Sequence, residues 1–299
     1  MTPAAKPTVH VVLNPQSGRG LWSVERVRAL FASSGIEVQA DCVRSASEAA
    51  LLARQAVQAG ADIVVAGGGD GTINTVAAAL IGKPPALGVL PMGTLNHFAK
   101  DLKIPMAIEE AVLVIARRHT SNVDVGEVNG HIFLNNSSLG LYPSIVMLRE
   151  QMKRDGLNKW VSLSFATIGT FVRMPHLELR MVAGGREVHL TTPFVFVGNN
   201  RYEVRGPRLG ERESLHRGEL FLSVAPGLGR VGLLRITLAA LRSTLTQSDG
   251  FDQECVTEFS VHSPHRHSRV SIDGEVRRIA NPLHYITRPG ALRVCVPGP

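Results

Sequence analysis

The chain has 299 residues, of which 44% are hydrophobic and 19% are charged, and its formal net charge is +7. This length allows two domains with buried cores, and the composition excludes a fibrous, low-complexity or repeat protein. No uninterrupted apolar run is long enough to cross a bilayer, and residues 1–6 lack the zones of a secretory signal peptide. The three cysteines are scattered and odd in number, which excludes a disulfide framework and a zinc pattern. We therefore expect a cytoplasmic protein.

The excess of basic residues favours an anionic partner, which is a nucleic acid, an anionic lipid or a nucleotide. Aromatic residues make up only 5% of the chain, and no known nucleic-acid-binding motif is present. We therefore expect no nucleic-acid partner, and the charge by itself does not choose between lipid and nucleotide.

The first 120 residues alternate between short apolar runs and amphipathic segments. The apolar runs predict strands at residues 9–13, 37–43, 63–66 and 87–90. The amphipathic segments predict helices that begin near residues 24 and 73, and a helix between them with Ser47 as its N-cap. Strands that alternate with helices indicate a doubly wound, mostly parallel α/β sheet, which binds ligands beyond the carboxyl ends of its strands.

After residue 118 the pattern changes to closely spaced strand-like runs. The pair Asn129-Gly130 lies between two such runs, at 123–128 and 132–134, and predicts a two-residue hairpin turn. Further strands are expected at 177–182, 187–190, 194–197, 220–224, 256–261, 270–272 and 292–296, with helices at 144–171 and 231–245. We predict an α/β domain over residues 1–123, a mainly antiparallel β domain over residues 124–299, and a cleft between them.

Neither a P-loop nor a Rossmann fingerprint is present, so any phosphate site must be built differently. The strongest local signal is Gly67-Gly68-Gly69-Asp70-Gly71-Thr72, which follows the third strand and opens a helix. Glycines let backbone N–H groups approach an anion, and the helix N-terminus adds a favourable dipole. Because the Asp70 carboxylate would repel phosphates unless a cation lay between them, the loop predicts a magnesium-nucleotide site. The alternative is a tight turn in which Asp70 caps the helix.

Two similar loops follow the first and fourth strands. Asn14-Pro15-Gln16-Ser17-Gly18 offers polar side chains and a sharp turn, and Pro91-Met92-Gly93-Thr94-Leu95-Asn96 opens a helix. Each loop taken alone is compatible with an ordinary connection. Because the carboxyl ends of parallel strands meet at one sheet edge, we expect the three loops to form a single site.

A second acidic motif, Asp273-Gly274-Glu275, lies late in the predicted β domain. An Asp-Gly pair normally marks a hairpin turn. Two acids that flank a glycine could instead place one carboxylate in the cleft as a general base.

Together, these motifs resemble the diacylglycerol kinase catalytic-domain family, which includes bacterial lipid kinases and the sphingosine and ceramide kinases. The motifs N-P-x-S-G at 14–18, G-G-D-G-T at 68–72, P-x-G-T-x-N at 91–96 and D-G-E at 273–275 occur in the order expected of that family. The resemblance implies an ATP-binding α/β domain like that of NAD kinases, followed by a β-sandwich domain for the lipid. It also implies an ATP-dependent lipid kinase that phosphorylates a lipid hydroxyl, with diacylglycerol as the default substrate.

The resemblance further implies which residues act. Asp70 would be the magnesium ligand, and Asp273 or Glu275 would take the proton from the lipid hydroxyl. The residues implied to bind ATP and Mg²⁺ are Asn14, Pro15, Ser17, Gly18, Gly67, Gly68, Gly69, Asp70, Gly71, Thr72, Gly93, Thr94 and Asn96.

The chain departs from the family pattern at three positions. His97 replaces an aspartate that many diacylglycerol kinases have, and Val43 lies where a threonine often follows the second strand. Arg217 lies where several bacterial relatives have an aspartate in an auxiliary Mg²⁺ site. Because an arginine cannot bind a cation, we expect this auxiliary site to be absent or altered.

A kinase with a lipid substrate must reach a membrane, and two basic segments favour peripheral association with an anionic membrane surface. The alternative is that both are ordinary solvated segments, and the sequence leaves a homodimer open. One segment contains Arg201, Arg205, Arg208, Arg212 and Arg217; the other contains Arg149, Lys153, Arg154 and Lys159, before Trp160 and an apolar run to Phe171.

Two other functions compete with a lipid kinase. The first is an NAD kinase, which shares the G-G-D-G core, although the N-P-x-S-G and P-x-G-T-x-N loops argue against it. The second is a nucleotide-sensing, membrane-binding protein that has lost catalysis. The presence of Asp70, Asp273 and Glu275 together argues against that loss.

Overall fold

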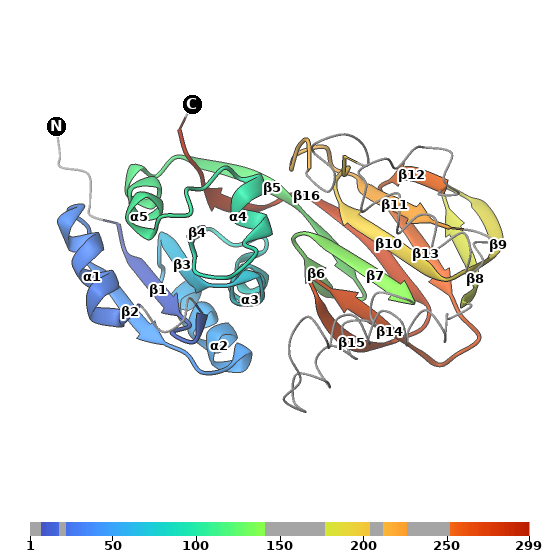
Figure 1. The fold of residues 1–299 in the computed structure, drawn as a ribbon, viewed down its shortest axis with the longest axis horizontal. Helices are drawn as coiled ribbons and strands as arrows, with labels where there is room; N and C mark the ends of the chain where they lie inside the picture. Colours follow the sequence, from blue (N-terminus) through green and yellow to red (C-terminus); the bar gives the residue numbers. More distant parts are fainter. Residues whose placement is uncertain (1–6, 18–21, 141–176, 204–211, 226–251, 299) are drawn as a thin grey trace, which may run out of the picture. The chain divides into compact units, whose positions relative to one another are not determined.

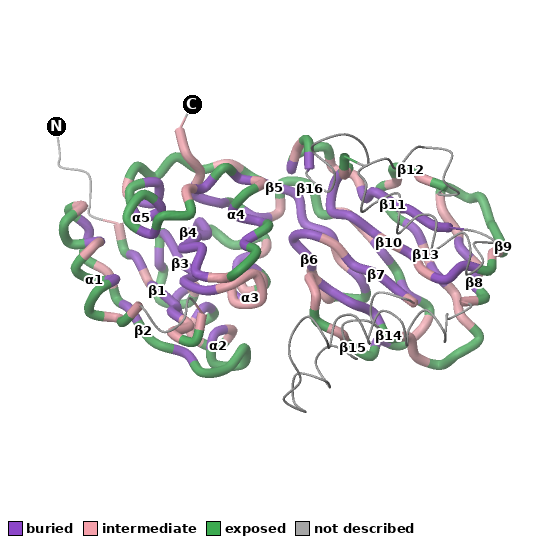
Figure 2. The backbone as a smooth tube through the Cα atoms, viewed as in Figure 1, coloured by how far each residue is buried: buried purple, intermediate pink, exposed green. Residues whose placement is uncertain are grey.

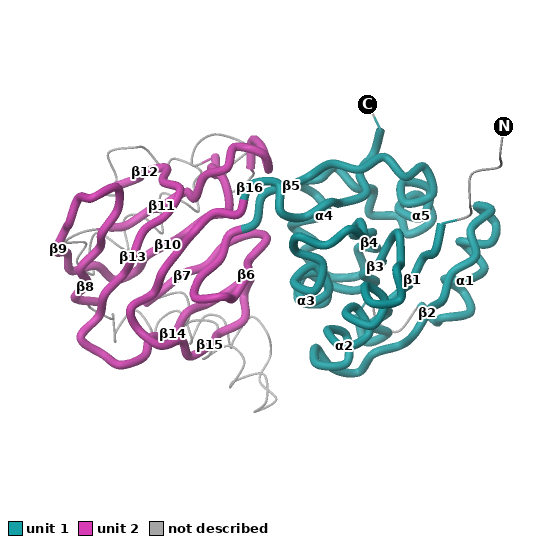
Figure 3. Tube along the Cα trace, turned by 180° about the vertical axis from the view of Figure 1, so that it is seen from behind, with its two compact units in different colours: residues 1–125, 289–299 teal, residues 126–288 magenta. Residues whose placement is uncertain are grey.

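The computed structural model describes residues 7–17, 22–140, 177–203, 212–225 and 252–298. The chain divides into two compact units, Met1–Val125 with Pro289–Pro299, and Gly126–Arg288 (Figure 3). The last eleven residues were expected in the second domain but belong to unit 1. The reason is that strand β16 pairs with β4 of that unit, with Val294 opposite Leu87. The helices expected at 144–171 and 231–245 lie outside the described residues.

Unit 1 is the expected α/β unit, with parallel strands in the order β2-β1-β3-β4 (Figure 1). Every residue of β3 and β4 is buried, as in a parallel sheet covered by helices (Figure 2). Helix α2 packs on α3, and α1 packs on α5. The elements are β1 (Val9–Leu13), α1 (Val24–Ser33), β2 (Val38–Cys42), α2 (Ala46–Gln58), β3 (Ile63–Gly68), α3 (Asp70–Leu80), β4 (Ala86–Pro91), α4 (His97–Asp101) and α5 (Ile108–Arg117).

Short polar residues begin the first two helices. The Ser23 side chain accepts a hydrogen bond from Arg26 N–H at the start of α1. Helix α2 begins after Ser45, whose hydroxyl accepts from Glu48 N–H at 3.2 Å. The prediction of Ser47 as the N-cap was wrong, because Ser45 has Glu48 three residues later, the spacing of a capping box.

Unit 2 consists of antiparallel strands, as expected, in two groups. One sheet has six strands in the order β12-β11-β10-β7-β14-β15. In the other group, β16 pairs with β13, β13 with β8, and β8 with β9, while β5 pairs with β6. The bounds are β5 (Thr120–Val128), β6 (His131–Phe133), β7 (Asn136–Gly140), β8 (Leu177–Ala183), β9 (Arg186–Thr192), β10 (Phe194–Asn199), β11 (Leu220–Val224), β12 (Asp252–Val256), β13 (Glu258–His262), β14 (His267–Ile272), β15 (Glu275–Ala280) and β16 (Leu283–Cys295).

One hydrophobic core joins the two groups of strands. It contains Val197 of β10 and Val270 of β14 from the six-stranded sheet, and Phe259 and Tyr285 from β13 and β16. The rings of Phe259 and Tyr285 stack with their centroids 4.8 Å apart. Unit 2 is therefore a β-sandwich, and its inner faces form the core shown as buried in Figure 2.

The predicted turn at Asn129-Gly130 is confirmed, since both residues have positive φ, as a type I′ hairpin requires. The strand predicted at 256–261 corresponds to β13, whereas Val256 ends β12 and Thr257 lies between the two strands. Strands β7 and β15 were not predicted. Within the described residues, no helix is long and apolar enough to span a bilayer.

Candidate active site

Three loops follow β1, β3 and β4 at the same edge of the unit 1 sheet. The register places Gly67 opposite both Leu13 and Leu90. Asn14 N–H donates to Gly67 O at 2.8 Å, and Met92 N–H donates to Gly68 O at 2.9 Å. The structure thus brings the three predicted loops of unit 1 together.

Side chains of the first loop bind the second loop. Asn14 Nδ2 donates to Thr72 Oγ1 at 3.2 Å. Ser17 Oγ accepts from Gly69 N–H at 3.3 Å. Both contacts join residues more than 50 positions apart in the chain, so the first loop supports the glycine-rich loop. Gly18 lies outside the described residues.

Asn96 stabilises the third loop from within. Its Oδ1 accepts from Gly93 N–H at 2.8 Å, and its Nδ2 donates to Gly93 O at 3.0 Å. Asn96 is 5% exposed and has a left-handed backbone with φ 49°. Because its polar atoms bond within its own loop, Asn96 shapes that loop, while Thr94 is exposed at the tip.

The second and third loops approach so closely that side chains would collide. A Cβ atom on Gly93 would lie 2.7 Å from the Cα of Gly69. A Cβ atom on Gly68 would lie 2.5 Å from the Cβ of Thr72. The glycines therefore permit this close packing of the loops at the sheet edge.

Asp70 is the first residue of α3, and Gly69 is the N-cap residue, so the alternative of Asp70 as the cap does not describe this helix. The Asp70 Oδ1 atom is buried and has no hydrogen-bond partner among the described residues. A buried carboxylate oxygen without a donor is costly unless a cation or a ligand satisfies it. The residues present thus fit a magnesium-nucleotide at the start of α3.

The protein by itself supplies few cation ligands here. Within the described residues, no group of three or more His, Cys, Asp or Glu side chains could hold a metal ion. Magnesium commonly binds through one or two carboxylates together with substrate phosphates and water. Asp70 is therefore suited to a metal that arrives with a nucleotide.

In unit 2, Asp273 and Gly274 form the turn between β14 and β15, with φ angles of 46° and 88°. The Asp273 carboxylate accepts three backbone hydrogen bonds. Leu134 N–H donates to Oδ2 at 2.8 Å, and Asn135 N–H and Asn136 N–H donate to Oδ1 at 2.9 Å. Asp273 thus fastens the hairpin to the segment between β6 and β7.

Arg212 binds the other side of the same segment. Its Nη1 donates to Leu134 O, and its Nη2 donates to Asn135 Oδ1 at 2.9 Å. Tyr202 Oη donates to Asn135 O at 3.0 Å. Arg212 is 8% exposed, so the expectation that it contributes to a membrane-docking surface was wrong. Because Leu134 and Asn135 are more than 70 residues away in sequence, no local pattern indicated this role.

Glu275 lies two residues beyond Asp273 and differs from it in environment. It is exposed, and its Oε2 accepts from Arg277 Nη2 at 3.2 Å. Arg277 also contacts His131 Nδ1 at 3.4 Å. Of the two acids of this motif, Glu275 has the accessible carboxylate.

Arg217 is occupied by a neighbour in its own segment. Its Nη2 lies 2.6 Å from Glu213 Oε2, and its N–H donates to Asn200 Oδ1 at 3.0 Å. An absent or altered auxiliary metal site remains a prediction. Arg201 of the same segment is exposed, and Arg205, Arg208 and residues 149–171 lie outside the described residues.

The chain thus has an α/β unit with three polar, glycine-containing loops at one sheet edge and a β-sandwich unit, which is the two-domain arrangement expected of a lipid kinase. Residues 8–128 match the diacylglycerol kinase catalytic domain. Over 97% of its length the chain is 30% identical to Probable lipid kinase YegS from Salmonella gallinarum, covering 96% of that protein. This chain therefore belongs to the diacylglycerol kinase catalytic-domain family of lipid kinases.

Other relatives agree with that placement. A diacylglycerol kinase from Staphylococcus aureus is 38% identical over 134 residues, which is 44% of this chain and 42% of that protein. A crystal structure of a diacylglycerol kinase from Bacillus anthracis has a TM-score of 0.70 at 16% identity, covering 97% of both chains. A second structure from that organism has a TM-score of 0.77 at 19% identity, covering 99% of this chain and 98% of that chain. The structural likenesses confirm the fold.

Proposed function

We propose that this lipid kinase transfers the γ-phosphoryl group of ATP to a hydroxyl of a membrane lipid, with diacylglycerol as the first candidate. The use of a magnesium-nucleotide as the phosphoryl donor is supported by the buried, unpartnered Asp70 Oδ1 at the start of α3. The choice of lipid is supported by the names of two relatives, a probable lipid kinase and a diacylglycerol kinase.

The three loops of unit 1 would hold the phosphates. They meet at one sheet edge, where the N-terminus of α3 adds a dipole that favours an anion. Asp70 would hold Mg²⁺, which neutralises charge on the transferred phosphoryl group when it is bound. Thr94, exposed at the tip of the third loop, offers a hydroxyl to the nucleotide.

For the proton of the lipid hydroxyl, we propose Glu275 as the base and Asp273 as a positioning residue. The Asp273 oxygens already accept three amide hydrogen bonds, which leaves them poorly suited to receive a proton. Glu275 is exposed, and its nearest described partner is a side chain that can move, Arg277. The membrane surface, at which such a lipid resides, is the proposed place of action.

The test is transfer of radiolabelled γ-phosphate from Mg-ATP to lipids in mixed micelles. The panel contains diacylglycerol, monoacylglycerol, phosphatidylglycerol, ceramide and sphingosine, with NAD in a parallel tube. We expect label in diacylglycerol and none in NAD. Label in NAD alone would instead identify an NAD kinase, and ATP binding without any labelled product would favour a nucleotide sensor.

The same assay tests the base. Glu275→Gln should lower turnover by about 100-fold, the order expected for loss of a general base. The matched control is Glu110→Gln, which neutralises another exposed carboxylate and should leave turnover unchanged. Full activity in the Glu275→Gln enzyme would remove Glu275 from the mechanism.

A further inference from the structure

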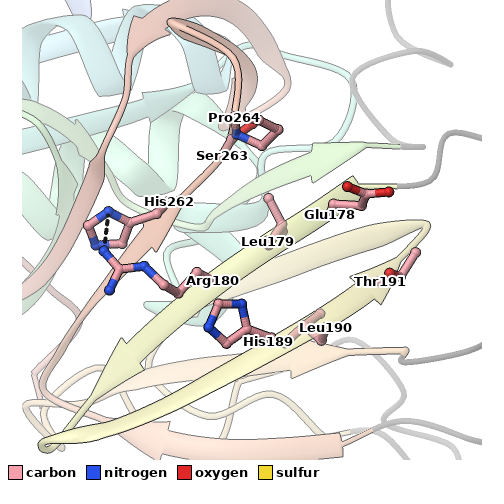
Figure 4. A pocket seen from close by; sticks show the side chains of 9 residues that line it. All are labelled: Glu178, Leu179, Arg180, His189, Leu190, Thr191, His262, Ser263 and Pro264. Atoms are coloured by element: carbon pink, nitrogen blue, oxygen red, sulfur yellow. Dashed lines mark hydrogen bonds between the residues drawn. The ribbon is translucent and has the colours of Figure 1, made fainter.

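Two cavities lie among the described residues of unit 2, and none of the described active-site residues lines either one. The smaller, of about 500 Å³, lies along β8, β9 and the end of β13 (Figure 4). The larger, of about 690 Å³, lies beside the segment that joins β13 to β14. They share Leu179 and Ser263 as lining residues, but their charges differ.

In the smaller cavity, the positive charge is already balanced. Arg180 Nη1 lies 3.0 Å from Glu187 Oε2, and His189 Nε2 lies 3.0 Å from Glu187 Oε1. Arg180 Nη2 also contacts His262 Nδ1 at 3.1 Å (Figure 4). An anion entering here would have to compete with the Glu187 carboxylate.

The described part of the larger cavity has a cationic rim without such a competitor. Among its described lining residues there is no aspartate or glutamate. Arg269 of β14 and Arg278 of β15 lie directly opposite each other in the strand register. Like charges in this arrangement destabilise a sheet, and an anion between the two guanidinium groups would remove that repulsion. The rim residues are Arg266, Arg269, Arg278, His265 and His267.

The lining of the same cavity also has an apolar part. Leu177 and Leu179 of β8 and Leu139 of β7 line it, and Leu177 is only partly buried against the core. An occupant that satisfies both parts has an anionic group at the rim and hydrocarbon against the leucines. Inorganic phosphate meets only the first requirement, whereas an anionic phospholipid meets both.

We propose that this cavity binds an anionic phospholipid of the bilayer. The phosphate lies between Arg269 and Arg278, where planar guanidinium groups can each donate two hydrogen bonds. An acyl chain lies against Leu177, which is only partly buried. The site holds unit 2 at the membrane without any nucleotide, so it goes beyond the proposed phosphoryl transfer and does not depend on it.

The test is co-sedimentation of the full chain with vesicles in the absence of ATP. We expect binding to vesicles of phosphatidylcholine with phosphatidylglycerol, and none to phosphatidylcholine alone. Arg269→Gln should weaken binding about 5-fold, and the Arg269→Gln/Arg278→Gln variant about 25-fold. The matched control is Arg186→Gln, an exposed arginine of unit 2 that lines neither cavity, and it should bind like the wild type.

Two further measurements separate this site from general charge and from a small-anion site. The melting temperature of the double variant should stay the same or rise, because the opposed arginines repel each other. A soluble short-chain phosphatidylglycerol should displace the protein from vesicles, whereas inorganic phosphate at the same concentration should not. No binding to anionic vesicles, an equal loss in Arg186→Gln, full binding by the double variant, or displacement by phosphate alone would each overturn the proposal.

Discussion

The dipeptide Asp-Gly occurs in both units, and its aspartate has opposite surroundings in the two places. In unit 1, Asp70 begins α3, and its buried Oδ1 has no partner among the described residues. In unit 2, Asp273 begins a hairpin turn, and its carboxylate accepts three backbone hydrogen bonds. The first aspartate is suited to a ligand, and the second to holding the fold.

This contrast shows that the residue type and its glycine neighbour do not determine the role. What differs is the supply of hydrogen-bond donors around the carboxylate. The segment after β6 presents three successive N–H groups to Asp273, whereas the glycine-rich loop leaves Asp70 Oδ1 without a donor. A buried carboxylate oxygen without a donor, such as Asp70 Oδ1, costs stability in the free protein and is available to a cation that binds.

The largest expected effect is that of Asp70→Asn on catalysis. Turnover should fall by about 100- to 1,000-fold, because a neutral amide is a poor magnesium ligand. The free energy of unfolding should stay the same or increase, since the substitution removes the charge next to the buried, unpartnered Oδ1 atom. Steady-state phosphate transfer and urea unfolding measure the two quantities. Wild-type turnover in this variant would contradict the role given to Asp70.

The next effect is the stability cost of removing the second aspartate. Asp273→Ala should lower the free energy of unfolding by about 2–4 kcal/mol, because three amide groups lose a charged acceptor. Urea unfolding followed by circular dichroism measures this. The neighbouring variant Glu275→Gln is the control, and its unfolding should match the wild type. Equal stabilities for the wild type and the Asp273→Ala variant would show that the three hydrogen bonds do not hold the hairpin.

A smaller effect distinguishes two glycines of the loop around Asp70. Gly68→Ala should cost about 1–3 kcal/mol of stability, because its Cβ would lie 2.5 Å from the Cβ of Thr72. Gly69→Ala should cost less, since its nearest contact would be 3.4 Å, to the Cα of Gly93. Thermal unfolding of both variants tests this order. Equal costs would mean that the close approach at Gly68 relaxes freely.

The smallest effect is a dependence of stability on pH. Burial, followed by the charge of Arg277, lowers the pKa of His131 below its usual 6.5. Burial, followed by Arg180, lowers the pKa of His262 in the same direction. Below pH 6.5 the unfolded chain therefore binds protons that the folded chain does not. The contribution of the two histidines to the free energy of unfolding is fully present above pH 6.5 and is lost as the pH falls toward their pKa values in the folded protein.

The measurement is the free energy of unfolding at several values between about pH 7.5 and pH 5.5. The slope should be smaller in a His131→Asn/His262→Asn variant than in the wild type. The control is His265→Asn, which removes an exposed histidine. Identical slopes in the wild type and the double variant would contradict the assignment.

Much of unit 1 could be predicted from local sequence. Apolar runs indicated β1, β3 and β4, because strands inside a parallel sheet are buried on both faces and are therefore mostly apolar. The loops that follow them were predicted to meet, because parallel strands end at one edge. Hydrogen bonds such as that from Asn14 Nδ2 to Thr72 Oγ1 join the first two loops there.

Strand β7 is an example of what could not be predicted. Its sequence, Asn136-Ser137-Ser138-Leu139-Gly140, has few residues that favour strands, yet it lies between β10 and β14 in the six-stranded sheet. Its neighbours on either side supply the pairing that its own residues do not favour. Tertiary pairing therefore overrides local preference in this strand.

By itself, the sequence determined the fold class and the three loops around Asp70, because these depend on local periodicity and on glycine-containing turns, and the order of its four motifs indicated the family by resemblance. Only the tertiary structure decided that Asp273 and Arg212 hold one segment from both sides, and that Arg269 lies opposite Arg278. Those contacts join residues distant in the chain or on paired strands. Their energies depend on which donors and charges folding brings together, and local sequence patterns do not contain that information.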